Sequence, residues 1–336
     1  MPTSVLPTSL RRLFPYQNFN PVQSACFDPA YSSDNSLVVA APTGSGKTGV
    51  LELALARLFS NGQKAGGGRA LAVYMAPLKA LTHERYLDWQ RKLHPLQVVE
   101  LTGDSADESA DERAVASADL IVTTPEKWDS FTRFKRDAQG VLGRLAVLLV
   151  DEVHALVDES RGPTLEAAIA RMRTVSQGEQ VQGMPIAKLR VLAASATMSN
   201  IDDIAAWLGP ATAVRQFGEE YRPVPLRWRV LTYPMGKVFA FDKMLTERLY
   251  SVIREHSSGR PSLCFCNSRK VCQQAASQVA NSAGARLIQS NAHREHLSAA
   301  SARLGDKGLA QLVRFGVGYH DASLEVADKR TVEVSR

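Results

Sequence analysis

The sequence predicts a doubly wound α/β fold, in which helices cover both faces of a parallel β-sheet. Six short apolar segments between residues 36 and 197 are rich in Val, Leu and Ala, and are nearly continuous rather than alternating. Strands that are buried on both faces have this pattern. Longer amphipathic segments separate the apolar ones, and such alternation is typical of a parallel sheet that binds ligands at the carboxyl ends of its strands.

Each expected strand is followed by small or polar residues. The strands read SLVVAAP (36–42), ALAVYMAP (70–77), LQVVELTGD (96–104), DLIVTTP (119–125), LAVLLVDE (145–152) and LRVLAASAT (189–197). The periodicity predicts helices between them, at residues 47–60, 79–92, 106–116, 126–136 and 163–175. Catalytic and binding residues are therefore expected directly after each apolar segment.

The alternation is interrupted after residue 210. Residues 211–234 are rich in proline and have an extended pattern, which predicts an interdomain linker or a crossover strand. Beyond it the pattern resumes with helices expected at 240–257, 268–282 and 306–315, and with a strand PSLCFCN at 261–267. We therefore predict a complete domain at 1–210, the linker at 211–234 and a partial second domain at 235–336.

Composition narrows the class of protein. The 336 residues are 45% hydrophobic and 22% charged, a globular balance that excludes a disordered chain. No apolar segment approaches the ~20 residues that a membrane span needs, so no membrane contact is expected. Residues 225–336 hold 17 Lys and Arg against 9 Asp and Glu, which suits a polyanionic partner as well as a solvated basic surface.

Four cysteines give a weak signal. Cys264, Cys266 and Cys272 lie close together, but without the paired spacing of most zinc sites. Two of them fall within the expected strand at 261–267. We therefore expect these cysteines to be buried free thiols that bind no metal.

The stretch APTGSGKT, from Ala41 to Thr48, lies between an expected strand and an expected helix and is named here the phosphate loop. Glycines let the backbone N–H groups point inward at phosphates, and the helix start adds the positive end of its dipole. Lys47 would reach the β- and γ-phosphates of ATP, and the Thr48 hydroxyl would bind Mg²⁺. The predicted nucleotide-binding residues of the loop are Thr43, Gly44, Ser45, Gly46, Lys47 and Thr48.

Two adjacent acids, Asp151 and Glu152, end the strand LAVLLV. A carboxylate at this strand end can hold Mg²⁺, and a neighbouring glutamate can orient and deprotonate an attacking water. Acids at a helix N-terminus, where they favour the dipole, are the structural alternative. Beside the phosphate loop we predict catalytic roles for Glu152, Asp151 and Lys47, with Thr48 and Asp151 as the metal ligands.

Three elements in a fixed order carry a family resemblance. APTGSGKT, DEVH (151–154) and SAT (195–197) resemble the motifs of the superfamily-two DExH-box helicases, in the large DExH group. LFPYQNFNPVQSACFD (13–28) and GVGYHDASLEVADKRTVE (316–333) are similar to segments of the meiotic crossover DNA helicases in that group. That family usually has His and Gly where this chain has Asp321 and Ser323.

The resemblance implies a RecA-like sheet of the P-loop NTPase type, with one complete domain and an incomplete second one. It implies that Gln23 reads adenine and that His154, Ser195 and Thr197 couple the nucleotide to the nucleic acid. It also implies nucleic-acid contacts, at positions where ordinary helix caps are the alternative. These residues are Pro77, Lys79, Gly103, Thr124, Lys127, Arg161 and Arg269.

The function that the resemblance implies is an ATP-dependent 3′-to-5′ DNA helicase, nuclear and active in meiotic recombination. Its cofactors would be ATP and Mg²⁺, and its substrate single-stranded or branched DNA. The family's later arginine motif is not found before Arg336, so we expect a C-terminally truncated, incomplete motor with weak hydrolysis. An RNA helicase of the exosome or spliceosome branch and a non-catalytic, ATP-gated nucleic-acid-binding module remain as alternatives.

Overall fold

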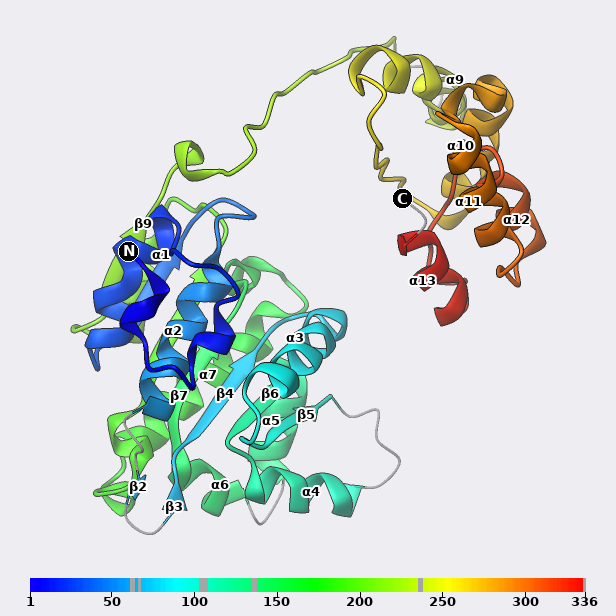
Figure 1. Cartoon of the computed structure of the whole chain (residues 1–336). Helices are drawn as coiled ribbons and strands as arrows, with labels where there is room; N and C mark the ends of the chain where they lie inside the picture. The colour runs from blue at the N-terminus through cyan, green and yellow to red at the C-terminus, as the bar shows by residue number, and fades with distance from the viewer. Residues whose placement is uncertain (61–63, 66–67, 103–107, 135–137, 235–237, 335–336) are drawn as a thin grey trace. The chain divides into compact units, whose positions relative to one another are not determined.

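A computed structural model describes residues 1–60, 64–65, 68–102, 108–134, 138–234 and 238–334 (Figure 1). The chain divides into two compact units, Met1–Trp228 and Arg229–Arg336, called unit 1 and unit 2. Within the described residues, no helix combines the length and the apolar character that crossing a membrane requires.

Unit 1 is built on a seven-stranded sheet in which every neighbouring pair is parallel. The strand order is β5-β6-β4-β7-β8-β1-β9, so the chain passes from β1, next to one edge, to β4 near the middle and β5 at the other edge, and then returns through β6, β7 and β8. The predicted doubly wound fold is therefore confirmed. The strands are β1 (Leu37–Ala40), β4 (Leu71–Met75), β5 (Val98–Leu101), β6 (Leu120–Thr123), β7 (Leu145–Val150), β8 (Arg190–Ser195) and β9 (Ala213–Gln216). A separate antiparallel pair joins β2 (Lys64–Ala65) to β3 (Gly68–Arg69).

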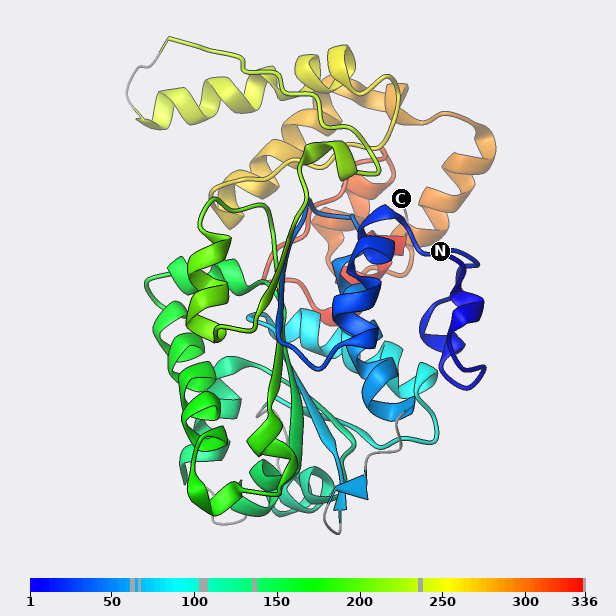
Figure 2. The same ribbon diagram turned by 90° about the vertical axis from the view of Figure 1, so that its left-hand side faces the viewer.

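Two hydrophobic cores lie on opposite faces of this sheet, as Figure 2 shows by the blue and green helices on either side of the strands. Successive strand residues alternate between them: Val38 and Leu148 join one core, while Val39 and Leu149 join the other. The helices of unit 1 are α1 (Pro21–Phe27), α2 (Lys47–Ser60), α3 (Lys79–Lys92), α4 (Glu108–Ser117), α5 (Pro125–Phe134), α6 (Ala138–Arg144), α7 (Gly162–Ser176) and α8 (Ile201–Leu208).

All six strands and all five helices predicted before residue 210 are present, and α2 and α3 have the predicted bounds. The short helices α1, α6 and α8 were not predicted. Strand β9 lies inside the predicted linker, where Ala213 pairs with Leu37 at the edge of the sheet. The linker pattern therefore begins after this strand in the structure, and the assignment of domains beyond it stays a prediction.

The described residues of unit 2 form helices and connecting loops, with no strand. Its helices are α9 (Val238–His256), α10 (Arg269–Ala283), α11 (Asn291–Ser301), α12 (Lys307–Val313) and α13 (Val326–Val334). A small core joins three of them, with Leu297, Leu309 and Val313 packed against Tyr319. The two residues that depart from the family pattern contact each other, since the Asp321 carboxylate accepts hydrogen bonds from the backbone N–H and hydroxyl of Ser323. It also accepts one from Gln273 of α10 at 3.0 Å.

The strand predicted at 261–267 is wrong. Phe265 is 89% exposed and Cys264 is exposed as well, and no described residue of unit 2 belongs to a strand. A parallel strand requires a neighbour to satisfy its backbone N–H and C=O groups, which an apolar pattern alone cannot supply. The expectation of buried thiols fails with it, because Cys266 and Cys272 are only partly buried and Cys26 in α1 alone of the four is fully buried.

Candidate functional site

The carboxyl ends of the central strands bring the predicted residues of unit 1 to one edge of the sheet. Backbone hydrogen bonds continue past the strand ends: Ala41 N–H donates to Ser195 O at 3.2 Å, and Asp151 N–H to Met75 O at 2.8 Å. Since β8 lies between β1 and β7, Ser195 sits between the phosphate loop and the strand that ends at Asp151. Residues separated by more than a hundred positions are thus neighbours along this edge.

The phosphate loop is held by side chains from the segment before it. Asn20 Nδ2 donates to Ser45 O at 2.8 Å, and Gln23 Nε2 donates to Gly46 O at 3.2 Å. Gly44 and Gly46 have positive φ angles of 81° and 89°, which glycine adopts most readily. A Cβ on Gly46 would lie 2.5 Å from Asn20 Nδ2 and 2.7 Å from Gln23 Nε2, so a larger residue here would require both side chains to move.

Helix α1 presents these two side chains through a capping box. Asn20 Oδ1 accepts from Gln23 N–H at 2.9 Å, while Gln23 Oε1 accepts from Asn20 N–H at 3.2 Å. Gln23, the predicted adenine reader, is buried against the loop. Sequence reasoning missed Asn20, although an Asn three residues before Gln and directly before Pro21 is the sequence signal of such a cap.

Lys47 faces both the loop and the acids. Its Nζ donates to Ala41 O at 2.8 Å and to Pro42 O at 3.1 Å. Burial lowers the pKa of Lys47, whereas the carboxylates of Glu152 and Asp151 raise it. The ammonium therefore lies within the electrostatic field of both acids, close to loop amides that suit phosphate.

Asp151 and Glu152 are held in different ways. Asp151 is buried, with Oδ2 accepting from the Tyr74 hydroxyl at 2.8 Å and Oδ1 accepting from Glu152 N–H at 2.9 Å. Burial is the largest cause that raises the pKa of Tyr74, followed by the charge of Asp151, so the hydroxyl keeps its proton and donates. Glu152 has φ = 52°, a strained conformation for a non-glycine residue of the kind that clusters at active sites, and its side chain is 39% exposed.

The predicted metal ligands have the chemistry of a Mg²⁺ site. Thr48 offers a hydroxyl at the second residue of α2, and Asp151 offers a carboxylate whose oxygens are already oriented by two donors. Mg²⁺ prefers few protein oxygens together with water and phosphate oxygens. No group of three or more His, Cys, Asp or Glu side chains that could hold a metal occurs among the described residues.

His154 connects the acid pair to the end of β8. Its Nδ1 lies 3.3 Å from Glu152 Oε2 and 3.3 Å from Ala196 N. The two contacts require opposite states, because Nδ1 accepts from the Ala196 N–H only without a proton and donates to Glu152 only with one. Of the other predicted coupling residues, Ser195 is fully buried and lies 3.2 Å from Met198 Sδ, while Thr197 is exposed.

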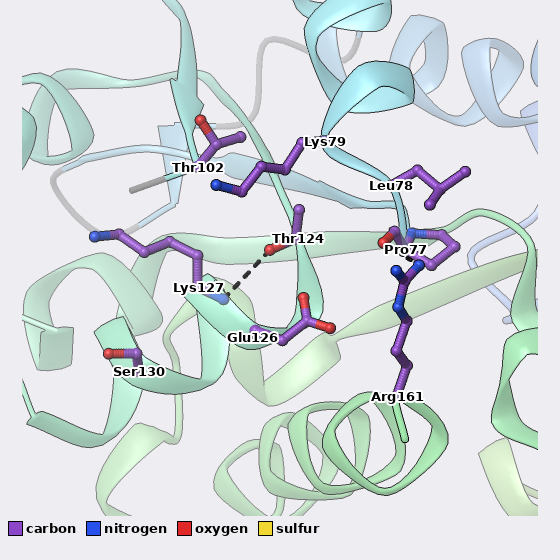
Figure 3. Close-up of a pocket in the computed structure, with 9 residues that line it drawn as sticks. All are labelled: Pro77, Leu78, Lys79, Thr102, Thr124, Glu126, Lys127, Ser130 and Arg161. Atoms are coloured by element: carbon purple, nitrogen blue, oxygen red, sulfur yellow. Dashed lines mark hydrogen bonds between the residues drawn. The ribbon is translucent and has the colours of Figure 1, made fainter. Parts of the chain in front are cut away.

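A groove with a cavity volume of about 580 Å³ lies at the ends of β4 and β6 (Figure 3). It brings together five of the seven predicted nucleic-acid residues, namely Pro77, Lys79, Thr124, Lys127 and Arg161. Gly103 lies outside the described residues, and Arg269 is the first residue of α10 in unit 2. Sequence reasoning missed four other residues that line the groove: Leu78, Thr102, Glu126 and Ser130.

Helix starts set the geometry of this groove. Arg161 Nη1 donates to Pro77 O at 3.2 Å, which joins the start of α7 to the loop before α3. Asp158 Oδ1 accepts from the backbone N–H groups of Ser160 and Arg161, and hydrogen bonds from Ser160 are the largest cause that lowers the pKa of Asp158. With three cationic side chains, hydroxyls and helix N-termini against one carboxylate, the lining suits a phosphate backbone.

Comparison with known proteins decides the family. The family model described as DEAD/DEAH box helicase matches residues 20–204, more than half of the chain, and this span contains the phosphate loop, the acid pair and the groove. The chain belongs to the DEAD/DEAH box helicase family. The predicted helicase resemblance is therefore confirmed, and members of this family use ATP.

Several curated relatives match along nearly the whole chain. They include the ATP-dependent DNA helicase homolog MER3 of Arabidopsis thaliana, at 37% identity over 98% of this chain and 30% of the relative. The probable ATP-dependent DNA helicase HFM1 of Mus musculus is 40% identical over 98% of this chain and 23% of the relative. Activating signal cointegrator 1 complex subunit 3 of Homo sapiens is 33% identical over 96% and 14%. The chain thus spans less than a third of the length of these relatives.

A solved structure agrees on the fold. The DUF1998 helicase MrfA, crystallised bound to DNA, superposes with a TM-score of 0.58 at 14% sequence identity. The match covers 84% of this chain and 39% of that one. At this identity the likeness concerns the fold alone, and it supports the RecA-like class of the sheet.

Proposed function

We propose that unit 1 of this helicase-family chain binds ATP with Mg²⁺ and hydrolyses it, weakly in this chain alone, as part of a motor that moves 3′-to-5′ along single-stranded or branched DNA. The observation that carries the proposal is the position of the phosphate loop, with Lys47, and of Asp151 and Glu152 at the carboxyl ends of β1 and β7, which are separated by β8 alone. The cationic groove lies on the same edge of the sheet. One strand, β4, serves both places, since Met75 bonds to Asp151 and Pro77 lines the groove.

The residues divide the chemistry among themselves. The loop amides and the Lys47 ammonium would bind the β- and γ-phosphates and offset their charge. Thr48 and Asp151 would hold Mg²⁺, which supplies further charge neutralisation on the same oxygens. Glu152 is accessible and adjacent, so its carboxylate would orient a water and accept the proton as the water attacks the γ-phosphate. Gln23 would select adenine.

The groove would hold the nucleic-acid backbone. Lys79, Lys127 and Arg161 would contact phosphates without reading bases, so binding would tolerate any sequence and weaken with salt. His154 would transmit the state of Glu152 to the segment after Ser195, because its Nδ1 faces both. Arg269 of unit 2 would add a further phosphate contact.

The choice of DNA rests on the relatives, which are named as ATP-dependent DNA helicases. A nuclear role in meiotic recombination is the finer part of the proposal. It is supported by the resemblance of residues 13–28 and 316–333 to the meiotic crossover DNA helicases. The part of unit 2 that follows the linker would act as part of a second RecA-like domain.

Steady-state ATP hydrolysis by this chain tests the proposal, measured alone, with single-stranded DNA and with RNA of the same sequence. We expect turnover that DNA stimulates more than RNA does. Glu152→Gln is the matched variant: turnover should fall by about 10²-fold or more while ATP binding persists. Stimulation by RNA alone would favour an RNA helicase, and ATP binding without turnover in either case would favour a non-catalytic, ATP-gated module.

A further inference from the structure

A series of buried polar side chains extends behind the nucleotide site and begins at a residue that has no role so far. It starts at Tyr74 in β4, whose side chain is fully buried and whose hydroxyl donates to Asp151 Oδ2 at 2.8 Å. A tyrosine hydroxyl in an otherwise apolar layer costs free energy unless it is hydrogen-bonded. Asp151 satisfies that hydroxyl, and the hydroxyl in turn restricts where the carboxylate can lie.

Tyr74 is itself held by a second layer. The ring of Trp89 from α3 meets the Tyr74 ring edge-on, with centroids 4.9 Å apart and an interplanar angle of 89°. Trp89 Nε1 donates to Glu52 Oε1 of α2 at 2.9 Å, and Lys92 Nζ lies 3.6 Å from the same oxygen. Glu52 is only 5% exposed, and it is a charged group that the phosphate loop does not use. Helices α2 and α3 therefore meet at the residues that fix the Tyr74 ring.

The hydrogen bond from Tyr74 restricts the rotation of the Asp151 carboxylate. The terminal torsion of an aspartate is broad, so its two oxygens do not hold one orientation unless hydrogen bonds select it. At Asp151 both oxygens have a donor, Glu152 N–H on Oδ1 and the Tyr74 hydroxyl on Oδ2. Each oxygen can still accept a further partner, since a carboxylate has about four lone-pair sites. The orientation is thus set before a cation arrives.

We propose that Tyr74 is a positioning residue, which orients the Asp151 carboxylate for Mg²⁺ and is itself held by Trp89 and Glu52. This inference rests on the proposed function, because it assumes that Asp151 is a metal ligand. Groups that orient a metal ligand from behind typically change metal affinity by about 10–100-fold when they are removed. Tyr74 would therefore contribute to Mg²⁺ affinity without touching nucleotide or metal.

The test is Tyr74→Phe in the full chain, which removes the hydroxyl and leaves the ring against Trp89. Binding of a fluorescent ATP analogue is titrated with Mg²⁺, and in parallel in EDTA. We expect the Mg²⁺ concentration for half-maximal binding to rise by about tenfold, with affinity in EDTA unchanged. A purely structural role would weaken both alike. Tyr86→Phe is the control, since that hydroxyl accepts only from exposed Gln90, at 2.9 Å.

A double-variant cycle sharpens the result. In an Asp151→Asn background, Tyr74→Phe should change the Mg²⁺ requirement no further, because the group that it positions has lost its charge. If Tyr74→Phe fails to fold, Trp89→Phe gives the same test one step removed, with a smaller rise expected. An unchanged Mg²⁺ requirement in the folded variant, beside a wild type that responds to Mg²⁺, would overturn the positioning role. A wild type whose nucleotide binding ignores Mg²⁺ would overturn the proposed function and this inference together.

Discussion

The two halves of the sheet edge in unit 1 are built differently. On the nucleotide side, Gln23 and Asp151 are buried and hydrogen-bonded at both ends of their side chains. On the groove side, the long side chains of Lys79 and Arg161 are exposed. Bond-making chemistry depends on the placement of single atoms, whereas contact with a phosphate backbone depends mainly on charge. Burial thus marks the half in which position matters.

The largest effect should come from the nucleotide half. In Lys47→Gln the side chain can still donate to Ala41 O, but the charge facing the phosphates is lost. We expect ATP turnover to fall by about 10²-fold or more, which is the order of loss for a removed transition-state contact. Nucleic-acid binding without nucleotide should remain as in the wild type. A variant that keeps most of its turnover would contradict the role given to the phosphate loop.

Gly46→Ala should reveal how tightly α1 holds the loop. An alanine at this position would have to adopt a positive φ, and its Cβ would meet Asn20 and Gln23. The free energy of unfolding should therefore fall by more than the about 1–2 kcal/mol that backbone strain alone costs. ATP affinity should be lost as well. Gly183→Ala is the matched control, because Gly183 has φ = 83° and nothing within 4 Å. Equal losses in the two variants, measured by chemical denaturation, would show that Asn20 and Gln23 yield easily.

In the groove half, Lys127→Ala should have a modest and uniform effect. We expect affinity for single-stranded DNA to fall by several-fold on every sequence, and the slope of log K against log salt to decrease by about 1. Lys188→Ala is the control, since this exposed lysine precedes β8 at the opposite edge of the sheet. A sequence-dependent loss would mean that the groove reads bases.

The smallest effect concerns Glu52 behind the nucleotide half. Burial is the largest cause that raises the Glu52 pKa above 4.5. A raised pKa in the folded state means that this group's contribution to stability is complete below pH 4.5 and is lost as pH rises through the folded value. Glu52→Gln keeps an acceptor for Trp89 but does not titrate. Its unfolding free energy relative to wild type should therefore increase as pH rises above 4.5, as thermal unfolding across pH would show.

The sequence predicted unit 1 well, because its signals are local. Short continuous apolar segments of Val and Leu are typical of strands covered on both faces, and APTGSGKT in its strand–helix frame needs no partner to be recognised. Asp151 could be placed beside Lys47 because parallel strands bring their carboxyl ends together. The groove residues followed from the family resemblance, and two of them, Thr124 and Pro77, lie one and two residues after their strands.

What the sequence could not predict depends on partners far along the chain. In the sequence, Tyr74 looks like one more residue of a buried strand. Only the pairing of β4 with β7 brings its hydroxyl to Asp151. Strand β9 has no strong apolar pattern and exists because β1 offers it an edge. The expected strand around Phe265 failed for the opposite reason, since its apolar pattern is not matched by a paired neighbour among the described residues.

The contact between Asp321 and Ser323 links the two positions at which this chain departs from the family pattern. Hydrogen bonds from Ser323, the largest cause, hold the pKa of Asp321 below its usual value, and Gln273 adds to them. Replaced singly by the residues usual in the family, either position would lose a partner, because glycine brings no hydroxyl and histidine brings no carboxylate. The two side chains are therefore coupled, and replacing either one alone should break hydrogen bonds of the other.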